Sequence, residues 1–83
     1  MDIDQARTFL AITAHGSFLE AAQRLHLTQS TVSARIHRLE EELGVRLFTR
    51  NRAGASLTPA GRRFLEHAKR LVRSEERRVG KEC

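Results

Sequence analysis

The side chains best suited to chemistry in this sequence are small and polar, and they gather between positions 28 and 38. A glutamine amide can bond adenine through two atoms, a serine hydroxyl can donate or accept, and an alanine methyl can meet a thymine methyl. These residue types fall near the start of a predicted helix, where side chains reach base edges best. We therefore predict DNA base contacts from four residues: Gln29, Ser30, Ser33 and Ala34.

Each of these positions also has a plainer interpretation. Gln29 could be a solvent-exposed residue of a first helical turn, and Ser30 and Ser33 could be small residues that let a phosphate approach closely. Thr28 favours a capping role, although the start of a helix also attracts phosphate. Thr31 falls on the exposed side of the same helix.

Basic side chains surround this polar group. Three on the same helix are expected to contact phosphates or water: Arg35, His37 and Arg38. Two more follow in a predicted hairpin and are expected at phosphates or in the minor groove: Arg50 and Arg52. The chain carries 15 Lys and Arg against 10 Asp and Glu, a net charge of +5. That charge favours a polyanionic partner but also fits an ordinary solvated surface.

Ser33, His37 and Glu41 recur at helical spacing, which superficially resembles a nucleophile relay. On a helix these side chains form an open row with no oxyanion hole or enclosing pocket, so we expect chance spacing and not an enzyme. The 4 histidines show no close pairing, and the single cysteine is the last residue. We therefore expect no metal site, no cofactor and no disulfide within the chain.

Two short helices with a tight break between them carry the polar residues. Ser17 can cap the first helix, with Glu20 completing a capping box. One apolar stripe follows, made of Phe18, Ala21, Ala22 and Leu25. Residues 26–28 interrupt that pattern. Helices joined so closely cross at a steep angle, which predicts a helix-turn-helix over residues 17–43.

A new apolar stripe in the second helix turns the polar residues outward. The stripe consists of Val32, Ile36, Leu39 and Leu43. We expect these four side chains to face the core, because positions three and four apart lie on one side of a helix.

Further elements flank the helix pair. A first helix is expected to begin at Asp2 or Asp4 and to end at Gly16. Residues 45–57 give a weak signal for a hairpin around a glycine-bearing turn, with an irregular basic loop as the alternative. Thr58 then caps a last helix, with Pro59 at its first position.

The last helix is expected over residues 59–74. Its apolar residues have a heptad-like spacing that predicts a partner helix, through the seam Phe64, Ala68 and Leu71. Apolar periodicity stops at Ser74, so we expect residues 75–83 to be frayed.

Length and hydropathy set the remaining limits. A chain of 83 residues makes one small domain. No apolar run approaches the length of a bilayer-spanning helix, and the first residues carry acids where an export signal needs bases. We expect a cytoplasmic, nucleoid-associated protein with no membrane partner.

From Met1 to about Val72 the chain resembles the N-terminal DNA-binding region of bacterial LysR-type transcriptional regulators. The resemblance rests on blocks of residues in a fixed order: Phe9-Leu10, Gly16-Ser17-Phe18, Ala21-Ala22, Leu25, Thr28-Gln29-Ser30, Val32-Ser33, Ile36, Leu39-Glu40, Leu43-Gly44, Leu47-Phe48, Arg50 and Leu57-Thr58-Pro59-Ala60-Gly61. It implies a mainly α fold: a winged helix-turn-helix over residues 1–58, with three core helices and a short β-hairpin wing. A linker helix that pairs two subunits would follow, and residues 75–83 would be non-native sequence.

The resemblance also implies a function. It implies sequence-specific binding of double-stranded DNA by a homodimer at a pseudo-palindromic operator. A small-molecule effector would bind only a larger C-terminal domain that these residues lack. Family members use the positions of Gln29, Ser30, Ser33 and Ala34 on bases, often with Arg or another polar residue at the last. They commonly carry a wing Arg at the position of Ala53, next to Arg52 here.

The competing interpretation is a helical protein-interaction module whose functional surface is the seam of the last helix. It would explain that helix, but it leaves the polar face of residues 29–38 without a purpose.

Overall fold

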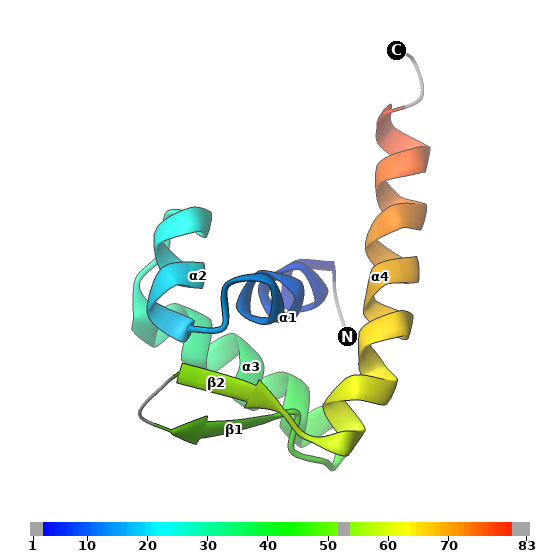
Figure 1. The fold of residues 1–83 in the computed structure, drawn as a ribbon. Helices are drawn as coiled ribbons and strands as arrows, with labels where there is room; N and C mark the ends of the chain where they lie inside the picture. Colours follow the sequence, from blue (N-terminus) through cyan, green and yellow to red (C-terminus); the bar gives the residue numbers. More distant parts are fainter. Residues whose placement is uncertain (1–2, 52–53, 81–83) are drawn as a thin grey trace.

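The computed structural model describes residues 3–51 and 54–80, and side chains as far as residue 74. The described elements are α1 (Ile3–His15), α2 (Phe18–Leu25), α3 (Gln29–Leu43), β1 (Phe48–Asn51), β2 (Gly54–Leu57) and α4 (Pro59–Gly80). Helices α1 to α3 pack together, the hairpin lies beside α3, and α4 rises along one side of the molecule (Figure 1). The predicted fold, a mainly α winged helix-turn-helix followed by a linker helix, is confirmed.

Helix α1 supplies the centre of the core. Phe9 has no exposed surface, and its ring centroid lies 5.3 Å from that of Phe48 in the wing and 5.0 Å from that of Phe64 in α4. Aromatic side chains bury large apolar areas, so one residue ties three elements together. Asp4 lies inside the first turn of α1 and Asp2 lies outside the described residues, so neither is established as the expected cap.

The helix pair α2 and α3 is capped at three points, before α2, after α2 and before α3. Ser17 precedes α2 and its hydroxyl accepts a hydrogen bond from the Glu20 backbone N–H at 3.2 Å, as the cap prediction required. At the other end His26 adopts a left-handed conformation with φ of 60°, an uncommon one for a non-glycine residue. Thr28 then caps α3 by accepting from the Thr31 N–H at 3.2 Å.

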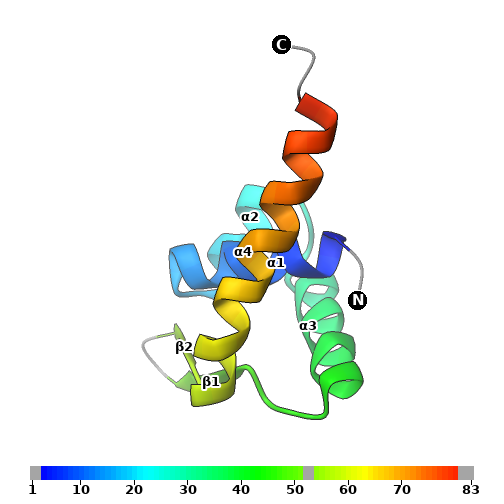
Figure 2. The ribbon, with the colours of Figure 1, turned by 90° about the vertical axis from the view of Figure 1, so that its right-hand side faces the viewer.

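The apolar stripe of α3 faces the core over most of its length. Val32, Ile36 and Leu39 are buried, as predicted. Leu43 is 40% exposed, so its assignment to the core was wrong. The last turn of α3 reaches the edge of the molecule, where the chain leaves for β1 (Figure 2), and periodicity cannot show where a packed neighbour ends.

The weak hairpin signal proves to be a two-stranded antiparallel sheet. Phe48 pairs with Leu57 and Asn51 with Gly54, and the connecting residues 52–53 lie outside the described part. Leu47 and Phe48 are both buried, which is why alternation is poor at the start of the wing.

The wing is docked on the turn between α1 and α2. The Ala55 N–H donates to the Gly16 carbonyl at 3.0 Å. A Cβ atom on Gly54 would lie 2.2 Å from that same oxygen, and Gly54 has φ of +133°. Only glycine meets both conditions without a shift of the backbone.

Helix α4 begins as expected and ends later. Thr58 accepts a hydrogen bond from the Gly61 N–H at 3.0 Å, confirming its capping role. The expected end at Ser74 is wrong, because the helix continues to Gly80. Residues 75–80 are rich in Glu and Arg, which form helices well without any apolar periodicity. Residues 81–83 lie outside the described part.

The seam on α4, predicted as a dimerisation surface, lies largely against the core of its own chain. Ala68 has no exposed surface, and Phe64 and Leu71 are half-buried against the core of their own chain. Helix α4 packs on α1 along this face, as the edge-to-face contact of Phe64 with Phe9 shows. The heptad-like spacing therefore marks an intramolecular helix contact.

Candidate nucleic-acid interface

The first turns of α3 present a polar surface to solvent. Because Val32, Ile36 and Leu39 hold the opposite face of the helix in the core, the residues between them point outward. The predicted base-contacting residues lie together here: Gln29, Ser30 and Ala34 are exposed and Ser33 is half-exposed. Thr28 is exposed and Thr31 half-exposed, and their hydroxyl oxygens lie 2.9 Å apart.

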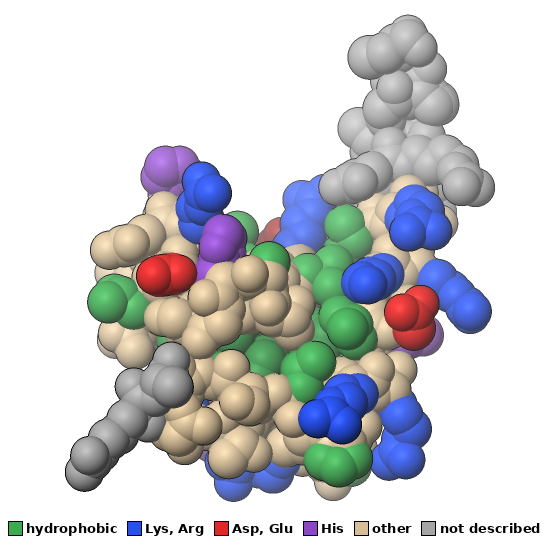
Figure 3. Space-filling model, viewed as in Figure 1, with side chains coloured by type: hydrophobic (Ala, Val, Ile, Leu, Met, Phe, Trp, Pro, Cys, Tyr) green, Lys and Arg blue, Asp and Glu red, His purple; other side chains and the backbone are tan. Residues whose placement is uncertain are grey.

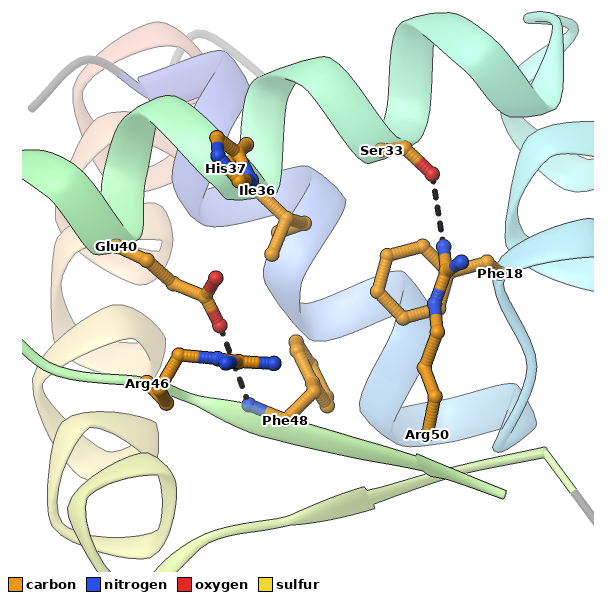
Figure 4. A pocket seen from close by; sticks show the side chains of 8 residues that line it. All are labelled: Phe18, Ser33, Ile36, His37, Glu40, Arg46, Phe48 and Arg50. Atoms are coloured by element: carbon orange, nitrogen blue, oxygen red, sulfur yellow. Dashed lines mark hydrogen bonds between the residues drawn. The ribbon is translucent and has the colours of Figure 1, made fainter.

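Arg50 joins this surface to the wing, a contact that sequence reasoning missed. Its Nη2 donates to the Ser33 hydroxyl at 2.8 Å, and its Cζ lies 3.8 Å from the centre of the Phe18 ring (Figure 4). Phe18 belongs to α2, Ser33 to α3 and Arg50 to β1. A guanidinium over an aromatic face is an attractive pair, so Arg50 connects three elements at one point. We call these three residues the Arg50 junction.

Glu40 makes a second link between α3 and the wing, also missed from the sequence. Its Oε2 accepts from the Leu47 N–H at 2.8 Å. It also accepts from the Phe48 N–H at 3.4 Å, the bond drawn in Figure 4. Glutamate is common on helix surfaces, so the residue type alone gives no sign that the side chain binds backbone seven residues later.

Between α3 and β1 lies a shallow hollow of about 210 Å³. Its lining includes His37, Arg46 and Arg50, side chains that carry or can carry positive charge (Figure 4). On the face in Figure 3, Lys and Arg side chains extend over α4 and along the lower edge of the molecule. The hollow also holds the carboxylate of Glu40, but two Arg side chains outnumber it, so the region beside α3 and the wing is suited to polyanions.

Two predicted phosphate contacts are engaged within the chain. Arg35 is half-buried and its Nη1 lies 3.4 Å from the Thr8 hydroxyl of α1, while its expected contact with phosphate stays a prediction. His37 is exposed and its Nε2 lies 3.8 Å from the Glu41 carboxylate. Within the row Ser33, His37 and Glu41, the Ser33 hydroxyl accepts from Arg50 of the wing, while His37 faces Glu41.

The remaining predicted residues are placed as follows. Arg38 is exposed on α3 and Arg50 is exposed on β1, whereas Arg52 and Ala53 lie outside the described residues. Within residues 3–51 and 54–80, no group of three His, Cys, Asp or Glu could hold a metal ion. In that same part of the chain, no helix has both the length and the hydropathy for crossing a membrane.

Comparison with known proteins places this arrangement among bacterial regulators. HTH-type transcriptional regulators resemble the chain over 72 residues, or 87% of its length: HdfR of Yersinia enterocolitica is 49% identical and TfdS of Cupriavidus pinatubonensis 47%. The aligned segment covers 25% and 24% of those relatives, so the chain spans about a quarter of their length.

Solved structures show the same fold together with DNA. The CbnR_DBD–DNA complex superimposes with a TM-score of 0.92 at 35% identity, covering 99% of this chain and 94% of that one. The BenM_DBD complex with benA site 1 DNA gives a TM-score of 0.90 at 34% identity, covering 99% and 92%. The model of bacterial regulatory helix-turn-helix proteins of the lysR family matches residues 3–62. The chain therefore belongs to the LysR family of bacterial helix-turn-helix regulatory proteins.

Proposed function

We propose that this chain binds double-stranded DNA sequence-specifically, as the DNA-binding domain of a bacterial transcription regulator. Helix α3 would enter the major groove, and the wing would contact the backbone or the minor groove. The observation that carries the proposal is the exposed polar start of α3, held outward by its buried apolar face. The DNA complexes of similar CbnR and BenM domains support it.

The exposure of each side chain indicates whether we expect it to contact bases or phosphates. Gln29, Ser30, Ser33 and Ala34 would meet base edges, while Arg38, His37 and Arg50 would contact phosphates. Arg52 keeps its proposed wing contact on sequence grounds. Thr28 and Thr31 order the start of α3, where backbone N–H groups also attract phosphate.

We also propose that two copies act as a homodimer through α4, each reading one half of a pseudo-palindromic operator. Half-sites would then lie about one DNA turn apart. The apolar surface that remains for a partner is the exposed part of residues such as Phe64 and Leu71, since Ala68 is fully buried. A small-molecule effector belongs to the longer regulators of the family, and the cytoplasm and nucleoid remain the proposed location.

The alternative of a helical interaction module loses its main support. Its proposed surface was the seam of α4, and that seam covers α1 in the same chain.

Fluorescence anisotropy with labelled duplexes tests DNA binding. The affinity should fall linearly with salt concentration on logarithmic axes, because phosphate contacts release counterions. Gln29→Ala combined with Ser33→Ala should erase sequence preference and leave non-specific binding, whereas Ser74→Ala, an exposed serine on α4, should change neither. Absence of binding at low salt would refute the proposal.

A further inference from the structure

The Arg50 junction determines the hydrogen-bonding role of Ser33 on the exposed face of α3. Arg50 is held from two directions, by the Ser33 hydroxyl at 2.8 Å and by the Phe18 ring at 3.8 Å. Phe18 is itself only 8% exposed and contacts Phe48 with ring centroids 5.6 Å apart. The guanidinium therefore rests on a packed support and not on a mobile surface.

The direction of the Arg50–Ser33 hydrogen bond is determined by chemistry. A guanidinium has five N–H donors and no acceptor, so the Ser33 oxygen must accept. A hydroxyl has one hydrogen and two lone pairs, and one lone pair is now used. The hydrogen of Ser33 stays available for a second partner. The adjacent positive charge strengthens that O–H as a donor and repels any donor group approaching the same oxygen.

We infer that Arg50 sets Ser33 as a hydrogen-bond donor toward DNA, so that Ser33 selects a base with a major-groove acceptor over cytosine. Such acceptors are N7 of a purine, O6 of guanine and O4 of thymine, whereas cytosine presents only an amino donor. The inference rests on the proposed function and deepens it. Arg50 acts here as a positioning residue, because it works through Ser33.

A phosphate contact by Arg50 is compatible with this role. Only one of its five N–H groups is used by Ser33, so the remaining edge of the guanidinium can meet a phosphate. The Phe18 ring holds the planar group in place while both partners are bound.

The test begins with selection of bound duplexes from a random library by the whole chain and by Ser33→Ala. The base pair read by Ser33 is the one whose preference disappears in the variant. Wild type should choose guanine, adenine or thymine on the contacted strand. Cytosine there should weaken binding by about threefold to tenfold, the worth of one hydrogen bond. An analogue that removes or weakens the contacted acceptor at that position should weaken wild type and leave Ser33→Ala unchanged. The analogues are a 7-deazapurine for N7, 6-thioguanine for O6 and 4-thiothymine for O4.

Variants of Arg50 then separate positioning from charge. Arg50→Met keeps a long side chain over Phe18 but has no donor, so discrimination against cytosine should fall to about twofold or less. Arg50→Lys keeps a charged donor and should preserve it. Arg70→Met removes the same charge from an exposed position on α4 and should leave the preference intact.

Three results would overturn the inference: cytosine chosen on the strand that Ser33 contacts, no pair sensitive to Ser33→Ala, or unchanged discrimination in Arg50→Met. The base-analogue measurement uses only wild type and Ser33→Ala, so it decides the matter even where an Arg50 variant fails to fold. Loss of all salt-sensitive duplex binding would instead refute the proposed function and the inference with it. Sequence-specific binding that ignores the analogue refutes only the inference.

Discussion

Replacement of Glu40 tests how the wing is attached to the proposed recognition helix. The Glu40 carboxylate is half-buried and accepts from two backbone N–H groups, Leu47 at 2.8 Å and Phe48 at 3.4 Å. Leu47 is fully buried and Phe48 is 4% exposed. Removal of the carboxylate would therefore leave a backbone donor in a buried segment with a weaker acceptor or none.

The magnitude follows from these two bonds. A hydrogen bond to a charged group contributes about 1.5–3 kcal/mol, and the 3.4 Å contact adds little at that length. Gln keeps a neutral carbonyl acceptor, so Glu40→Gln should lower the free energy of unfolding by about 1–2 kcal/mol. For a domain of this size that corresponds to a decrease in Tm of about 4–16 °C.

Urea unfolding followed by far-ultraviolet circular dichroism measures the change. Glu41→Gln is the matched control, because Glu41 is the next residue of α3, is 71% exposed and faces His37 at 3.8 Å. An exposed pair of this kind should change stability by less than about 0.5 kcal/mol. Equal effects of the two substitutions, or none from Glu40→Gln, would refute the proposed attachment.

Three further substitutions test the packing, each by urea or thermal unfolding. Gly54→Ala should cost more than Gly44→Ala, which should lose about 1 kcal/mol from its positive φ alone. A new Cβ at Gly54 would lie 2.2 Å from a backbone oxygen, whereas one at Gly44 would have no neighbour within 4 Å. Phe9→Ala should cost about 3–5 kcal/mol, because its ring contacts two others in the core. Ala68→Leu should lower the free energy of unfolding by about 1–3 kcal/mol at any protein concentration, because the larger side chain would overpack against α1. A smaller effect would show that Ala68 is not buried against α1.

The elements with strong local signals were predicted from the sequence. The three predicted caps, Ser17, Thr28 and Thr58, are caps in the structure. They could be predicted because capping involves only neighbours within a few residues. Helix ends without such signals were not predictable in the same way. Leu43 continues the apolar period of α3 but lies 40% exposed at the end of the helix. Residues 75–80 continue α4 although they have no apolar period.

The exposed surface of α3 was also predictable, since burial of one helix face turns the opposite face outward. The bonds that modify this surface were not. Ser33 and Arg50 are 17 residues apart and Thr8 and Arg35 are 27 apart, so only the folded chain shows that they meet. Likewise, the spacing of Phe64 and Ala68 predicts a helix partner but cannot tell α1 of the same chain from a second subunit.

These long-range bonds have a joint consequence for recognition. The wing is fastened to the turn before α2 through Gly16, to α3 through Glu40, and to both helices through Arg50. Because three separate contacts join the wing to the helix pair, we expect α3 and the wing to approach DNA as one rigid unit. A wing placed on the backbone would then fix the depth and rotation of α3 in the groove, so base preference would depend on residues that touch no base. Arg50 and Glu40 are the side chains through which that dependence would act.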